Sequence, residues 1–188
     1  MKSSKSLIVT LIVLIVLAAL YRFIPNRPLG FAPQIAMALF GGAMIKDKKW
    51  AFALPIFSMF LSDLLYQAFS STPGFYEGQW LNYCLFAGIT LLGFTLKKVT
   101  VLRVAGYSLL GPVLFFLLSN GYYWLAGGTD IRSNLLLDRS LAGLLQSYAQ
   151  GLPFLRGALI ATFVFSTILF GGYYLLTAKS HKASPVRA

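Results

Sequence analysis

Long apolar runs, separated by short polar or proline- and glycine-containing stretches, dominate this chain. A helix that crosses a membrane needs about 20 mainly apolar residues. The pattern predicts six such helices, at residues 6–24, 30–45, 50–69, 79–96, 104–126 and 153–177. The second run is short and carries Pro33 in its first turn, where proline is tolerated. The predicted fold class is therefore all-α: a polytopic membrane protein with six transmembrane helices in one bundle.

A further segment, residues 134–150, is amphipathic rather than uniformly apolar. Its hydrophobic positions recur at helical spacing, whereas its charged positions face elsewhere; the two sets are Leu137, Leu141, Leu144, Leu145 and Tyr148, against Asp138 and Arg139. This spacing predicts an extra helix lying at the membrane interface between the fifth and sixth helices. The organisation that follows is one transmembrane domain, residues 1–178, and a basic cytoplasmic tail, residues 179–188.

Composition supports a membrane location. Hydrophobic residues make up 57% of the 188 residues and charged residues 11%, against about 25% charged in soluble domains. So few charges cannot cover a water-facing surface, which excludes a soluble enzyme, and the high hydrophobicity excludes disorder. Cys84 is the single cysteine, so no disulfide framework is possible. We expect it to be a small buried hydrophobe, with a soft metal ligand as the alternative.

The net charge of +11 is distributed unevenly between the two sides of the predicted bundle. Eleven of the 16 basic residues, including every lysine, fall on the side that holds both termini. The positive-inside rule assigns that side to the cytoplasm. The charge is thus explained by topology and by contact with membrane lipids, and we expect no nucleic-acid partner.

Asp63 stands inside the third predicted span, where a charge is costly and marks a candidate functional residue. It can serve as a structural ion pair, or as a carboxylate that contacts a ligand in an outward-facing pocket. Arg22 and Arg156, at helix ends on the outer side, are its possible partners. Both can instead extend to lipid headgroups. In either case we expect an arginine or hydrogen-bond donors to satisfy the carboxylate.

The outer helix ends are richer in polar and aromatic residues than the inner ends. Aromatic residues at this depth commonly form an interfacial belt, but with convergent polar groups they also suit a small-molecule site. The predicted ligand-binding set is Arg22, Asp63, Gln79, Trp80, Tyr83, Asn120, Tyr123, Trp124 and Arg156. The segment 127–150, with Gly127 and Gly128 as hinges, is a possible lid over such a site.

Several kinds of chemistry have no residues to support them. His181 is the single histidine and lies in the tail, so a histidine-ligated haem or metal centre within the bilayer is excluded. The sequence holds no P-loop and no nucleophile–base arrangement within the spans. We expect no catalytic residues, no enzyme activity, no metal and no cofactor.

Three stretches carry a resemblance to known proteins: residues 22–43, residues 53–63 and Gly151-Leu-Pro-Phe-Leu-Arg-Gly157. They resemble a family of small bacterial inner-membrane proteins of unknown function. That family is itself similar to the substrate-binding S components of energy-coupling factor (ECF) transporters, whose pattern is matched here by Leu39-Phe-Gly-Gly42, Lys46-Asp-Lys-Lys49 and Ser62-Asp63. The resemblance implies an outward-facing ligand pocket and contact with a transmembrane coupling subunit that ATPases drive.

Three functions remain in competition at this point. The leading one is an S-component-like subunit that binds a vitamin or a similar small solute in a bacterial inner membrane. The second is an accessory or assembly subunit of a larger membrane complex without a ligand of its own, and a weaker third is a membrane enzyme that acts on lipid. A pocket requires that Asp63, Asn120 and Trp80 point into the bundle, whereas a structural subunit requires that they pair off or face a partner.

Overall fold

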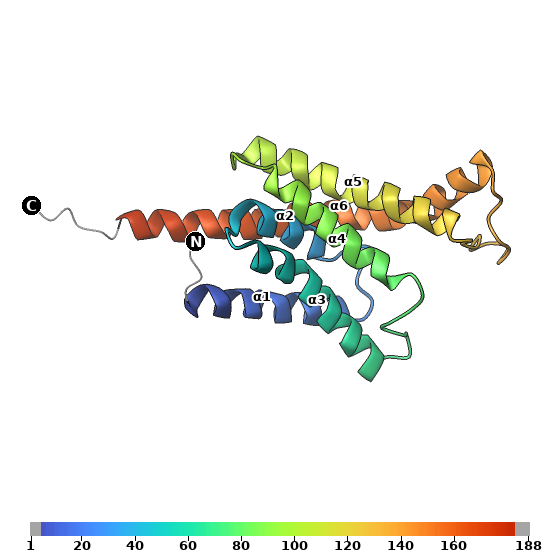
Figure 1. Ribbon diagram of the computed structural model, residues 1–188, viewed down its shortest axis with the longest axis horizontal. Helices are drawn as coiled ribbons and strands as arrows, with labels where there is room; N and C mark the ends of the chain where they lie inside the picture. The colour runs from blue at the N-terminus through green and yellow to red at the C-terminus, as the bar shows by residue number, and fades with distance from the viewer. Residues whose placement is uncertain (1–4, 183–188) are drawn as a thin grey trace, which may run out of the picture.

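The computed structural model describes the backbone of residues 5–182 and the side chains of residues 8–177. The described chain is all-α, as predicted (Figure 1). Its six helices are α1 (Lys5–Phe23), α2 (Gln34–Met44), α3 (Lys48–Phe69), α4 (Gln79–Phe94), α5 (Val101–Leu125) and α6 (Leu141–Lys182). The start of α1 and the end of α6 lie at the same end of the bundle (Figure 1).

The short helix α2 forms the centre of the bundle and contacts α3, α4, α5 and α6. Its residues 34–42 are all buried, which accounts for the absence of charge from this helix. Gly42 and Gly93 allow α2 and α4 to cross closely, since a Cβ atom on Gly42 would overlap the backbone of α4. Small residues at helix crossings serve this purpose in membrane bundles.

Two buried hydrophobic clusters fill the space on either side of α2. The first joins α1, α2, α3 and α6, with Leu11, Phe40, Leu54 and Phe170 among its members. The second joins α2 to α4, α5 and the middle of α3, around Leu39. The core is thus built around the shortest helix, and the longer helices form its outer wall.

Three helices are long and apolar enough to cross a membrane: α3, α5 and residues 141–177 of α6. The apolar part of α1, Ile8–Phe23, is shorter. At 1.5 Å per residue, the 11 residues of α2 extend about 16 Å, well short of a hydrocarbon core of about 30 Å. Six helices are confirmed, whereas among the described residues only three have the length expected of a complete span.

The separate interfacial helix predicted at residues 134–150 is wrong. Residues 126–140 form a loop, and α6 begins at Leu141 and continues without a break through Pro153. The helix starts here because the Ser140 hydroxyl accepts from the backbone N–H of Gly143, in the manner of an N-terminal cap. The predicted sixth helix therefore begins twelve residues earlier than its apolar run.

Candidate functional site

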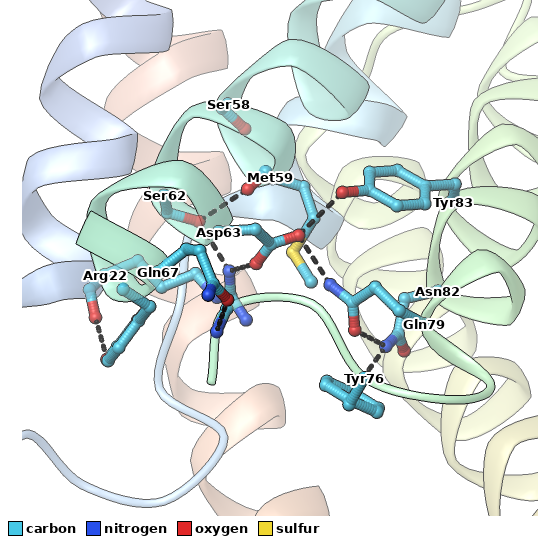
Figure 2. Close-up of polar contacts among 12 residues, drawn as sticks. Arg22, Ser58, Met59, Ser62, Asp63, Gln67, Tyr76, Gln79, Asn82 and Tyr83 are labelled. Carbon is cyan, nitrogen blue, oxygen red and sulfur yellow. Dashed lines mark hydrogen bonds and ion pairs between the residues drawn. The ribbon is translucent and has the colours of Figure 1, made fainter. Parts of the chain in front are cut away.

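Asp63 lies at the centre of a polar network that joins three helices (Figure 2). The residue is 1% exposed. One carboxylate oxygen accepts from the Arg22 guanidinium of α1 at 2.6 Å. The other accepts from the Gln79 amide at 2.5 Å and the Tyr83 hydroxyl at 2.7 Å, both on α4. The prediction that an arginine or hydrogen-bond donors satisfy this carboxylate is confirmed.

The Arg22 side of the network is held by residues one turn apart on α3. Arg22 also donates to the Ser62 hydroxyl at 2.5 Å, and Ser62 in turn donates to the carbonyl of Met59 at 2.7 Å. The Tyr66 hydroxyl donates to the carbonyl of Arg22 at 2.8 Å, while its ring centroid lies 5.8 Å from the guanidinium carbon. Arg22 is thereby fixed through both its backbone and its side chain.

The α4 side depends on helical spacing. Gln79 and Tyr83 are four residues apart and so share one face of the helix, and this face points to Asp63. The Gln79 amide oxygen accepts from Asn82 at 3.2 Å, and Asn82 also donates to the Tyr76 hydroxyl at 2.8 Å. Both amide groups are therefore engaged, and Gln79 presents its nitrogen to the carboxylate.

Two loops pack against this end of the bundle. In the loop between α3 and α4, the backbone N–H of Gly74 donates to the Gln67 side chain at 3.2 Å, and a Cβ atom at Gly74 would overlap the Asp63 carbonyl. In the loop between α1 and α2, Arg27 donates to the carbonyl of Phe31 at 3.1 Å. A Cβ atom at Gly157 of α6 would overlap the backbone of this second loop. The site is closed by protein on these sides.

This network contains an ion pair whose carboxylate is buried and engaged through both oxygens, while the Arg22 side chain is partly exposed. Removing one partner from such a pair typically costs 3–5 kcal/mol, because a buried charge is left uncompensated. Both carboxylate oxygens have partners within the chain, so the arrangement ties α1, α3 and α4 together. The described residues contain no group of three or more His, Cys, Asp or Glu side chains that could hold a metal ion.

The structure brings together four of the nine predicted site residues: Arg22, Asp63, Gln79 and Tyr83. The other five lie elsewhere. Trp80 is 56% exposed, and its ring centroid lies 5.6 Å from that of Tyr122. Arg156 is exposed on α6. Asn120 donates to the carbonyl of its own helix at Phe116, at 2.9 Å.

Tyr123 and Trp124 are engaged with the loop between α5 and α6. The Tyr123 hydroxyl contacts Thr129, and the Trp124 indole donates to the carbonyl of Asp138 at 2.8 Å. The Arg139 guanidinium donates to carbonyl oxygens at the end of α5 and lies 5.9 Å from the Trp124 ring centroid. These contacts hold the loop against the end of α5. The second half of the predicted lid, from Leu141, belongs to α6.

Two hollows on the described surface contain none of the nine residues. One, of about 430 Å³, lies between α4, α5 and α6 and is lined by Leu81, Leu85, Leu117, Leu118, Gly121, Tyr122, Leu125 and Tyr148. The other, of about 370 Å³, lies between α1 and α3 and is lined by Ile12, Ile15, Val16, Trp50, Phe57, Phe60, Leu61 and Leu64. Both are open at the surface and almost wholly apolar, unlike the polar pocket that the sequence predicts.

Gln34, which we did not predict as a site residue, is an unusual polar residue of the interior; the amide nitrogen of Gln146 is likewise buried without a partner among the described residues. Gln34 is 2% exposed, and neither its amide nitrogen nor its amide oxygen has a partner among the described residues. Such unpaired buried groups are rare in native proteins. A signal was available, since Gln34 is a polar residue in the first turn of an otherwise apolar helix.

Cys84 also differs from its prediction. We predicted that Cys84 would be buried, but the residue is exposed. Because Cys84 lies four residues after Trp80, both occupy the face of α4 that points away from the network. Trp80 and Cys84 each follow one residue after Gln79 and Tyr83, so they lie on a different face of α4, and this spacing accounts for the exposure of both.

Taken together, the fold and the site define a helical, candidate multi-pass membrane protein with a closed polar network. The chain belongs to a family of unknown function, DUF6580, which matches residues 2–184. This agrees with the first part of the resemblance, to a family without known function. No curated protein and no solved structure matches the chain.

Proposed function

We propose that this chain is an S-component-like subunit of a membrane transporter, which binds a small vitamin-type solute between its helices. The proposal includes a transmembrane coupling subunit driven by ATPases as its partner, and no enzyme activity of its own. It places the protein in a bacterial inner membrane as one domain of six membrane-embedded helices, with both termini and the basic tail in the cytoplasm.

The observation that carries the proposal is the buried, unpaired amide of Gln34. A buried polar group without a partner costs about 1–3 kcal/mol, so the site gains stability if a solute supplies the missing hydrogen bonds. An amide offers a donor and an acceptor side by side. It therefore suits a neutral solute with the complementary pair, such as a ring amide, rather than a strongly charged one.

The polar network at Asp63 has a supporting role in this proposal. It joins α1, α3 and α4 to one another, while the loop at residues 70–78 packs on α3 and the loop at residues 24–33, which leads into Gln34, packs on α6. Because its carboxylate is fully engaged, we do not assign Asp63 as a ligand-contacting group. Gln34 takes that role.

A second function, an accessory subunit without a ligand, is favoured by a different observation. Asp63 is paired within the chain and Trp80 faces outward beside Tyr122, which is the arrangement expected if these residues serve structure and partner contact. In this case the exposed aromatic face of α4 and α5 is the surface that meets the partner.

Native mass spectrometry of gently purified protein separates the two functions. We expect a small molecule to co-purify with the wild type and with Trp80→Ala, and to be lost from Gln34→Leu. The solute proposal fails if no small molecule is retained and Gln34→Leu simply unfolds at a higher denaturant concentration. Loss of a co-purifying membrane protein from Trp80→Ala alone then supports the accessory function.

A further inference from the structure

The groove between α1 and α3 has an apolar wall and a basic end. All eight lining side chains are hydrophobic, and several are substantially exposed, including Phe57 at 55% and Ile12 at 49%. Trp50 lines the groove from the first turn of α3. Immediately before it, Lys46, Lys48 and Lys49 are exposed around the helix start, with Asp47 as the one nearby acid.

The volume of the groove limits what can fill it. A helix about 10 Å in diameter, rising 5.4 Å per turn, occupies about 420 Å³ in each turn. The groove, at about 370 Å³, is smaller than one such turn, so only side chains of a partner helix would enter it. A single acyl chain is thinner and can lie along the side chains of α1 and α3.

The charge at the groove's end selects the kind of lipid. The Asp47 carboxylate is partly engaged, because it accepts from the backbone N–H of Lys49 at 2.9 Å. The Lys48 ammonium nitrogen lies 5.9 Å from the centroid of the Phe94 ring, so this lysine is directed toward α4. The exposed Lys46 and Lys49 remain to meet a lipid headgroup. The three lysines outnumber the acid, and the N-terminal end of α3 adds the positive end of its dipole. Basic clusters next to membrane helices bind anionic headgroups.

We infer that the α1–α3 groove is a binding site for an anionic phospholipid, with an acyl chain along Ile15, Val16 and Phe57 and the headgroup phosphate at Lys46 and Lys49. This site is separate from the solute site proposed at Gln34, which lies in the interior of the bundle. The lipid-site proposal does not depend on the proposed transport function.

The test measures lipid retained on the full-length protein by native mass spectrometry after equilibration with mixed micelles of detergent and dioleoyl phospholipid. The two probes are phosphatidylglycerol and phosphatidylcholine, which share their acyl chains and differ in net charge. We expect phosphatidylglycerol to bind at least tenfold more tightly than phosphatidylcholine. Equal binding of the two lipids would overturn the proposal.

Two kinds of variant locate the site. Each lysine near a membrane surface contributes about fivefold to the binding of anionic lipid, so Lys46→Gln with Lys49→Gln should weaken phosphatidylglycerol binding at least tenfold. The matched control, Lys97→Gln with Lys98→Gln, removes the same charge outside the groove and should change binding less than threefold. If the control pair weakens phosphatidylglycerol binding as much as the test pair, the lysines attract the lipid by their net charge alone and the proposed site is refuted.

A groove-filling substitution, Val16→Trp, tests the apolar part with all lysines intact. We expect at least a tenfold loss of bound phosphatidylglycerol, with an unchanged helical circular dichroism spectrum and elution volume. If Val16→Trp does not fold, the two lysine pairs still decide the question. A wild type that appears as a dimer without lipid, and that Val16→Trp converts to a monomer, would assign the groove to a second copy and overturn the proposal.

Discussion

The ion pair between Arg22 and Asp63 makes a sharp prediction about stability. Replacing Arg22 with glutamine leaves the carboxylate, which is 1% exposed, with only its two donors from α4. Breaking a buried pair on one side typically costs 3–5 kcal/mol. Because Gln79 and Tyr83 continue to donate, and the Arg22 side chain is itself 18% exposed, we expect a loss near the lower end, about 3 kcal/mol.

The assay is equilibrium unfolding in detergent, followed by tryptophan fluorescence and circular dichroism. Arg156→Gln is the matched control, because Arg156 is an exposed arginine on α6 and surface substitutions usually change stability by less than about 0.5 kcal/mol. A double-mutant cycle with Asp63→Asn should give a coupling energy of about 2 kcal/mol. If Arg22→Gln costs no more than Arg156→Gln, or if the coupling energy is zero, the network does not hold the helices together.

Three further predictions follow from packing, charge and exposure. Gly74→Ala should destabilise the protein by at least about 1 kcal/mol in the same unfolding assay, since its Cβ atom would overlap the backbone of α3, whereas Gly88→Ala, which meets open space, should be neutral or stabilising. In intact cells, with Cys84 replaced by serine, an impermeant thiol reagent should label Glu77→Cys and spare Lys98→Cys; the reverse pattern would invert the proposed topology. In purified wild type, a maleimide small enough to enter the detergent belt should modify Cys84 without prior unfolding, because the residue is exposed; modification only in denaturant would contradict its position.

The sequence alone was enough to predict the pairing of Asp63, but only part of its surroundings. A charge inside an apolar run must find a partner, and that requirement led to two candidates, Arg22 and Arg156, of which Arg22 forms the ion pair. The spacing of Gln79 and Tyr83 also places them on one face of a helix, and the same rule turns Trp80 and Cys84 away. The prediction of the site was wrong for residues that were grouped by their depth in the membrane, without regard to the helix face on which each one lies.

The fold shows a similar division between what a pattern can and cannot predict. Apolar runs located all six helices, since burial in lipid or in the core requires them. They did not locate the start of α6, because its first twelve residues are amphipathic and Pro153 resembles a helix start. Proline is tolerated inside membrane helices when neighbouring groups satisfy the freed carbonyl. A hydropathy pattern does not show whether a proline lies inside a helix or at its start.

The continuity of α6 has a mechanical consequence. Its 42 residues extend about 63 Å, roughly twice the thickness of a hydrocarbon core of about 30 Å. A rod of this length, bent where its first turns are inclined to the rest of the helix (Figure 1), must tilt or project into water by several turns. The α5–α6 loop is attached to one end of α6. A change in bilayer thickness that alters the tilt of α6 therefore also displaces that loop.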